Sequence, residues 1–132
     1  MNGETDLAVL LKQMSPLINE GDYFFCAVID GSLPAIKEAT CFFREKEGIT
    51  FILEKSLADS MQLTYSIVCS WITLTVHSSL EAIGLTSAVS TSLSNEGVSC
   101  NMIAAFYHDH IFVPKKDAAK AMEILLRFQE GN

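Results

Sequence analysis

The chain repeats one order of elements along its length, and this repeat constrains the fold more than any other feature. Sequence patterns predict a helix, a glycine turn, a strand, a hairpin and a helix in residues 7–63, and the same order again in residues 85–128. Phe42-Phe43, followed by an apolar strand and a helix, corresponds to Phe106-Tyr107 followed by the same two elements. A chain of 132 residues with such a repeat is expected to form two related halves.

Spacing of apolar residues and turn residues places the individual elements. Apolar residues recur three and four positions apart in each predicted helix, whereas aromatic and β-branched runs bounded by Gly, Asn and Asp mark the strands. Ser56 and Asp59 have the spacing of a capping box for the second helix. The expected helices span residues 6–14, 56–63, 85–95 and 117–129, and the expected strands span residues 23–29, 39–45, 49–54, 67–77, 99–107 and 111–113.

The fold class follows from how these elements are distributed. The first half has no strand before its opening helix, and the second has none after its closing helix, so the run 67–77 must connect them. Each half is then an incomplete β-α-β-β-α-β unit, which packs its helices on one face of an antiparallel sheet. We therefore expect an α+β protein of two tandem ferredoxin-like modules, residues 1–66 and 67–132.

Charge narrows the range of partners. The net charge is −7, and the Lys and Arg residues form no basic cluster. Binding to a phosphate backbone or to an anionic membrane surface depends on such clusters. We expect no nucleic-acid partner and no membrane partner, and no apolar run reaches the length of a membrane-spanning helix.

The cysteines and the N-terminal residues indicate a cytoplasmic protein. Each of the four cysteines lies in an apolar or β-branched run, and none forms a C-x-x-C pair. The first six residues are polar and acidic, without the basic and apolar regions of a signal peptide. We expect a cytoplasmic location, where thiols stay reduced.

Three segments of the second half resemble a known family. WITLTV (71–76), SSLEAIGLT (78–86) and FYHDHIFVP (106–114) resemble the second module of small stand-alone bacterial proteins with tandem ACT-like domains. Leu17 and the segment YFFC (23–26) are similar to the first module of the same family.

The resemblance implies a fold and a general role but no specific ligand. It implies ferredoxin-like modules, sheets that assemble side by side, and a ligand site in the loop between the first strand and the first helix of a module. Related modules occur in the cytosolic arginine sensors of animals and, more distantly, in biosynthetic enzymes regulated by amino acids. Many members of the family have no known function.

The loop that precedes the helix at residue 85 is the candidate ligand site. A helix N-terminus presents free N–H groups to a ligand carboxylate, Glu81 could pair with a ligand ammonium or guanidinium, and Gly84 would allow close backbone approach. The competing interpretation is that Ser78 and Glu81 only form a capping box, with Gly84 as a turn residue. The candidate residues are Ser78, Ser79, Glu81, Ile83, Gly84 and Leu85.

His108, Asp109 and His110 resemble a metal-binding pattern, because residues two apart on a strand share a face. The triplet, however, falls where the second hairpin is expected to turn, and Asp109 is a common turn residue. A zinc site would also need a fourth ligand, such as His77 or Cys100. We therefore expect no metal site and no cofactor.

The sequence favours a regulator over an enzyme. It has no nucleophile-elbow motif and no glycine-rich phosphate loop. The leading hypothesis is a sensor that binds an amino acid or a similar metabolite. An adaptor that binds no ligand and a small enzyme using Glu81 with a histidine remain alternatives. Because strands 23–29 and 100–106 are apolar on both faces, we expect a homo-dimer or a higher homo-oligomer.

Overall fold

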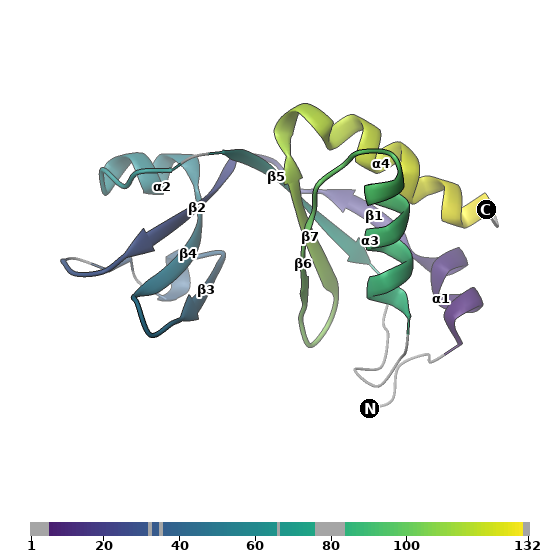
Figure 1. The fold of residues 1–132 in the computed structure, drawn as a ribbon, viewed down its shortest axis with the longest axis horizontal. Helices are drawn as coiled ribbons and strands as arrows, with labels where there is room; N and C mark the ends of the chain where they lie inside the picture. The colour runs from purple at the N-terminus through teal and green to yellow at the C-terminus, as the bar shows by residue number, and fades with distance from the viewer. Residues whose placement is uncertain (1–5, 32, 35, 66, 76–83, 131–132) are drawn as a thin grey trace. The chain divides into compact units, whose positions relative to one another are not determined.

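The computed structural model describes residues 6–31, 33–34, 36–65, 67–75 and 84–130. The chain forms two compact units, which we name unit 1 (Met1–Glu20 with Ser70–Asn132) and unit 2 (Gly21–Cys69) (Figure 1). Unit 1 therefore combines the first twenty residues with the second half of the chain. The predicted module boundary between residues 66 and 67 rests on the repeat in the sequence and stays a proposal.

Unit 1 contains an antiparallel sheet with the strand order β1-β5-β7-β6. Its longest helix, α3, has eleven residues, and no helix in the described ranges is long and apolar enough to cross a membrane. β1, which pairs with β5 from Ser15↔Thr75 to Ile18↔Ile72, was not predicted from the sequence. The elements are α1 (Leu7–Gln13), β1 (Ser15–Ile18), β5 (Val68–Thr75, in this unit from Ser70), α3 (Leu85–Asn95), β6 (Asn101–Ala104), β7 (Asp109–Pro114) and α4 (Ala118–Leu126), with 3-10 turns at Lys115–Asp117 and Arg127–Glu130.

Unit 2 is built around a hairpin and one short helix. β4 pairs with β3 on one side and with β2 on the other, and Val68 and Cys69 of β5 continue the sheet beside β2. Its elements are β2 (Tyr23–Val28), a 3-10 turn (Ile36–Glu38), β3 (Cys41–Arg44), β4 (Ile49–Glu54) and α2 (Lys55–Ser60).

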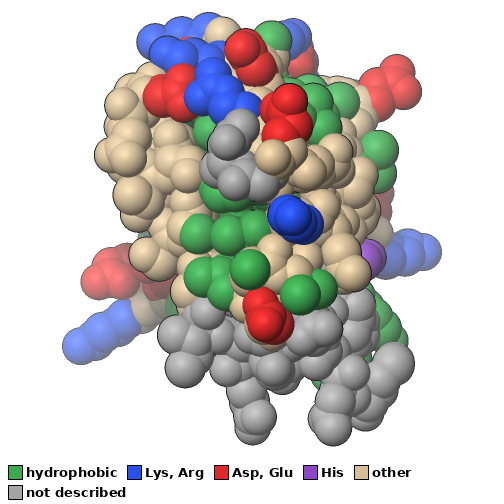
Figure 2. Space-filling view, turned by 90° about the vertical axis from the view of Figure 1, so that its right-hand side faces the viewer, with side chains coloured by type: hydrophobic (Ala, Val, Ile, Leu, Met, Phe, Trp, Pro, Cys, Tyr) green, Lys and Arg blue, Asp and Glu red, His purple; other side chains and the backbone are tan. Residues whose placement is uncertain are grey.

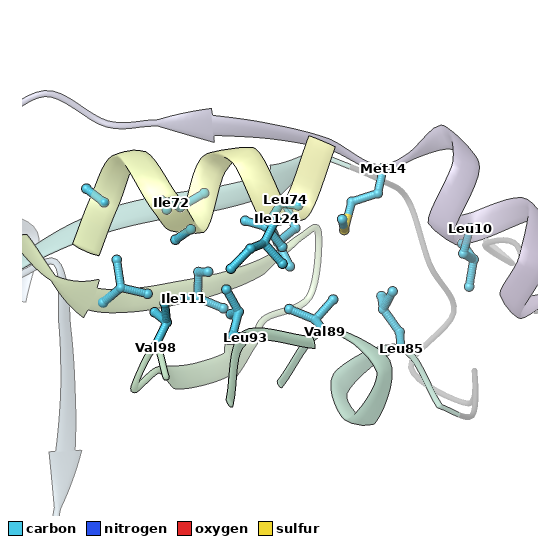
Figure 3. Close-up of a cluster of buried hydrophobic side chains, with 14 residues drawn as sticks. Leu10, Met14, Ile72, Leu74, Leu85, Val89, Leu93, Val98, Ile111 and Ile124 are labelled. Atoms are coloured by element: carbon cyan, nitrogen blue, oxygen red, sulfur yellow. The ribbon is translucent and has the colours of Figure 1, made fainter. Parts of the chain in front are cut away.

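The core of unit 1 lies between its sheet and its helices (Figure 3). Alternation along each strand sends one set of side chains to this side, for example Ile72 and Leu74 of β5, which are fully buried. Each such large apolar side chain stabilises the fold by about 1.5–3 kcal/mol relative to an exposed one. Figure 3 labels Leu10, Met14, Ile72, Leu74, Leu85, Val89, Leu93, Val98, Ile111 and Ile124 in this core.

Unit 2 has a separate apolar core beneath α2. Ala58 of α2 is fully buried against alternate residues of β2 and β4, among them Phe24 and Leu53. The ring of Phe24 stacks on Tyr65 with centroids 3.6 Å apart. Helices therefore cover one face of the antiparallel strands in each unit, which confirms the predicted α+β fold class.

The start of α2 corrects one local prediction. Glu54, not Ser56, occupies the N-cap, and its carboxylate accepts a hydrogen bond from the Ser56 N–H at 3.0 Å. Asp59 instead pairs with Lys55 at 2.6 Å, one helical turn away. The predicted capping box was therefore wrong, because a carboxylate one residue before the helix took the capping position.

Candidate functional site

The N-terminus of α3 begins at Gly84 without a side-chain cap. Gly84 is the N-cap residue, with φ 96° and ψ −10°, a left-handed conformation that favours glycine. The N–H groups at the start of α3 thus receive no hydrogen bond from the side chain of the cap residue. The capping-box interpretation concerns Ser78 and Glu81, which lie outside the described residues.

Only two of the six candidate residues lie in the described part of the chain. Gly84 is partly exposed, while the side chain of Leu85 is 4% exposed and belongs to the core. Leu85 can therefore serve a ligand through its backbone, not through its side chain. Ser78, Ser79, Glu81 and Ile83 lie outside the described residues.

Asp109 is a buried carboxyl group that sequence reasoning missed. It is the first residue of β7 and is 6% exposed. Ile111 and Val113, two and four residues later, belong to the core of unit 1, so alternation directs Asp109 to the same, helix-covered side. The sequence analysis treated it as a turn residue, but the described turn lies at 105–108, where Ala105 N–H bonds to His108 O.

Contacts between β5 and β7 place Asp109 at the end of the sheet where α3 begins. Trp71 of β5 packs on Phe112 of β7, whereas Thr73 contacts His110, so β5 residue numbers rise as β7 numbers fall. Asp109 directly precedes His110, so it lies beside the C-terminal end of β5. Leu85, the first residue of α3, packs in the same core as Leu74, near that end of β5.

The Asp109 carboxyl is in an unfavourable environment for a charge. No hydrogen bond or ion pair links it to another side chain among the residues that the structure describes. Burial raises the pKa of Asp109, and the nearby His108 partly offsets this increase. His108 Nδ1 is also buried and has no hydrogen-bond partner within the described ranges. A buried nitrogen without a protein partner thus directly precedes the buried Asp109 carboxyl in the sequence.

On the opposite face of β7, the side chain of His110 has a hydrogen-bond partner. Trp71 Nε1 donates a hydrogen bond to His110 Nδ1 at 3.0 Å. Burial, with a smaller contribution from His108, lowers the pKa of His110. Asp109 and His110 thus lie on opposite faces of β7, and the described residues contain no cluster of three or more metal-ligating side chains.

A hollow of about 240 Å³ lies between the C-terminal parts of α3 and α4, away from Asp109 in the sequence. Its two charged groups satisfy each other, because Arg127 donates to Glu96 at 2.5 Å. We therefore interpret this hollow as a gap where the two helices pack together, and not as a ligand site. It is lined by Ser92, Asn95, Glu96, Ile124, Arg127 and Phe128.

Figure 2 shows the side of the molecule that appears on the right in Figure 1. On this face, Lys and Arg side chains lie beside Asp and Glu side chains, with apolar side chains between them. The charges of the described residues on this face are thus mixed in sign.

Comparison with models of protein families shows which family the chain belongs to. One ACT domain model matches residues 2–70, and a second matches residues 66–127. The chain belongs to the ACT domain family. Both matches are to ACT domains, which typically bind small regulatory ligands, and none is to a catalytic domain. Among curated proteins, none matches this chain.

Solved structures support this assignment over nearly the whole chain. A protein of unknown function from Vibrio cholerae is 45% identical, with a TM-score of 0.81, and the match covers 93% of this chain and 95% of that one. An Agrobacterium tumefaciens protein has a TM-score of 0.71 at 16% identity, over 88% of this chain and 89% of that one.

Part of a larger enzyme shares the fold of this ACT protein. Escherichia coli aspartokinase III, solved in complex with aspartate and ADP, matches with a TM-score of 0.59 at 11% identity. The match covers 86% of this chain and 33% of the enzyme. At this identity the likeness concerns the fold alone.

Proposed function

We propose that this ACT protein is a regulatory protein, not an enzyme, and that it binds an amino acid or a similar small metabolite where β5, β7 and α3 meet in unit 1. The observation that carries the proposal is Asp109, a carboxyl that is 6% exposed and has no hydrogen-bond or ion-pair partner in the described part of the chain. Leaving a carboxylate buried without a partner is costly, and a cationic ligand group would offset that cost.

The chemistry of an α-amino acid suits the two ends of this site. The free N–H groups at the start of α3 would bind the ligand carboxylate, because a helix N-terminus favours negative charge. Asp109 and Glu81 would bind the ligand ammonium and a second cationic group. This assignment retains the predicted loop residues Ser78, Ser79, Glu81, Ile83 and Gly84, adds Asp109, and assigns Leu85 a role through its backbone only.

The family relationship supports a ligand of this kind. Both halves match ACT domains, and the structure of aspartokinase III, which shares the fold, holds the amino acid aspartate. Both family matches are ACT domains, and we propose that the protein passes its signal to another protein.

A second candidate function is an adaptor that assembles through apolar surface and binds no ligand. Large apolar side chains are exposed at both hairpins, including Phe43 (71%), Phe106 (68%) and Tyr107 (65%). Such side chains are typical of protein–protein contacts. The adaptor hypothesis does not explain why the carboxyl group of Asp109 is buried.

A melting-temperature screen against the twenty proteinogenic amino acids separates the two candidates. A ligand that binds only the folded protein raises its melting temperature, by an amount that grows with ligand concentration. We expect at least one amino acid to stabilise the wild-type protein and to lose this effect with Asp109→Asn. Asp59→Asn, which changes an exposed aspartate on unit 2, is the matched control. A flat screen with the wild-type protein would favour the adaptor.

A further inference from the structure

Four side chains form a hydrogen-bonded network on the sheet face of unit 1 that lies opposite its helices. Trp71 Nε1 donates to His110 Nδ1 at 3.0 Å, and Thr73 Oγ1 lies 3.2 Å from the same nitrogen. Asn19 Nδ2 donates to Thr73 Oγ1 at 2.9 Å and to Trp71 O at 3.2 Å. The network therefore joins the residue that follows β1 to β5 and to the first residues of β7.

The donors in this network determine the protonation of His110. An indole N–H can only donate, so Nδ1 of His110 must offer a lone pair and the imidazole proton must lie on Nε2. The Thr73 hydroxyl can then only donate in its contact with Nδ1, where it shares the single lone pair with Trp71, and its oxygen accepts from Asn19. A protonated imidazole has no acceptor and would lose its hydrogen bond with Trp71, whereas the Thr73 hydroxyl could turn to accept a hydrogen bond from Nδ1.

The surroundings of His110 favour the neutral ring. Thr73 is 7% exposed, and burial lowers the pKa of His110, with a further decrease caused by His108. The facing residues on β5 and β6 are Trp71, Thr73 and Ile103, and none of them carries a charge. The titratable groups that flank His110 are His108, beside it, and Asp109, on the other face of β7.

We infer that His110 is the positioning residue for Asp109, and that proton binding to His110 releases the network and, with it, the end of β7 that carries Asp109. Asp109 follows directly on the turn at residues 105–108, so it occupies a strand end, where pairing is least secure. Successive strand residues share one backbone but face opposite sides, so anchoring His110 on one side fixes Asp109 on the other. The effect on ligand binding rests on the proposed function, whereas the release of the network does not.

The release is tested through Trp71, the only tryptophan of the chain. We expect its fluorescence and its indole N–H resonance to shift in one transition, with a midpoint below about 6.5, the ordinary value for histidine. His110→Gln keeps an acceptor but cannot titrate in this range, and should abolish the transition. His108→Gln and His77→Gln should retain it. A wild-type protein without a transition, or an unchanged transition in His110→Gln, would overturn the inference.

A measurement on the wild-type protein alone covers the case in which His110→Gln does not fold. Imidazole nitrogen chemical shifts report which ring nitrogen carries the proton. At pH 8 they should place the proton of His110 on Nε2, and a proton on Nδ1 would overturn the inference.

The positioning role is tested with L-arginine as the probe, because its ammonium and guanidinium can use two carboxylates. We expect the affinity of the wild-type protein for arginine to fall at least tenfold as His110 becomes protonated, and that of His110→Gln to change little over the same range. An affinity that stays constant through the Trp71 transition would disprove the positioning role. If arginine binds at no pH, the ligand is not an amino acid with two cationic groups, and the Trp71 transition still decides whether the network opens.

Discussion

Gly84, the N-cap of α3, lies against Leu7, the first residue of α1. A Cβ atom on Gly84 would come within 3.0 Å of Leu7 Cδ2, closer than such atoms normally approach. The start of α3, where we place the ligand carboxylate, is therefore packed against a residue almost eighty positions earlier in the chain. Glycine at this position has no side chain to oppose the left-handed backbone conformation, and it leaves room for the close contact with Leu7.

Substitution of Gly84 should be more destabilising than substitution of a glycine with the same backbone constraint alone. Gly97 also has a positive φ, 79°, but its Cβ would meet nothing within 4 Å. We expect Gly97→Ala to lower the free energy of unfolding by about 1–2 kcal/mol, the ordinary cost of the left-handed conformation. Gly84→Ala should lower it further. Denaturant unfolding measures both, and equal effects would show that Leu7 moves aside freely.

Asp109→Asn should stabilise the protein in the absence of ligand. The substitution removes a buried charge that has no protein partner in the described residues, which we expect to raise the free energy of unfolding by about 1–3 kcal/mol at neutral pH. The same substitution should weaken amino-acid binding, as expected of a site where function opposes stability. A loss of stability at pH 7 in Asp109→Asn would indicate that the carboxylate has a stabilising partner.

The gain from Asp109→Asn should depend on pH in a defined direction. Burial raises the folded-state pKa of Asp109 above its unfolded value, so the folded protein takes up a proton more readily than the unfolded chain. The wild-type carboxyl therefore destabilises the fold at pH values above its folded pKa, and this penalty disappears as the pH falls below its unfolded pKa. The difference in unfolding free energy between the two proteins should thus be largest at neutral pH and vanish in acid.

Self-association should depend on the exposed aromatic pair at the second hairpin. Phe106 and Tyr107 pack edge to face with centroids 5.0 Å apart, and both are exposed. We expect a homo-dimer at micromolar concentration, and Phe106→Asp should weaken it about tenfold, or about 1.4 kcal/mol. Phe43→Asp at the first hairpin is the comparison. Sedimentation velocity measures both, and a wild-type monomer at micromolar concentration would contradict the prediction.

The elements themselves could be predicted largely from the sequence. Clear alternation at Trp71–Thr75 predicted β5, and the spacing of Leu85, Val89 and Leu93 predicted the buried face of α3. These patterns are local, so a single sequence reveals them. β1, in contrast, has only four residues, and its identity as a strand depends on pairing with β5 more than fifty residues away.

The candidate site was less predictable, for a related reason. A lone Asp after a histidine at a hairpin has the composition of a turn, and its burial becomes visible only once the strand register is known. If β7 begins at Asp109, the carboxyl shares its side of the strand with Ile111 and Val113, which is an unusual position for a charge. The predicted strand began at residue 111, two residues after the observed start, and this difference was enough to hide the buried carboxyl.

The central claim is that this ACT protein binds an amino acid with a second cationic group through Asp109 and Glu81, at the start of α3. Calorimetric titration of L-arginine into the wild-type protein, Asp109→Asn and Glu81→Gln tests it most directly, with Asp59→Asn as the control. We predict that each of the two site substitutions weakens binding by about 1.5–3 kcal/mol, the range for hydrogen bonds to charged groups, while the control has wild-type affinity. Equal affinity in all four proteins, or no binding to the wild-type protein, would contradict the claim.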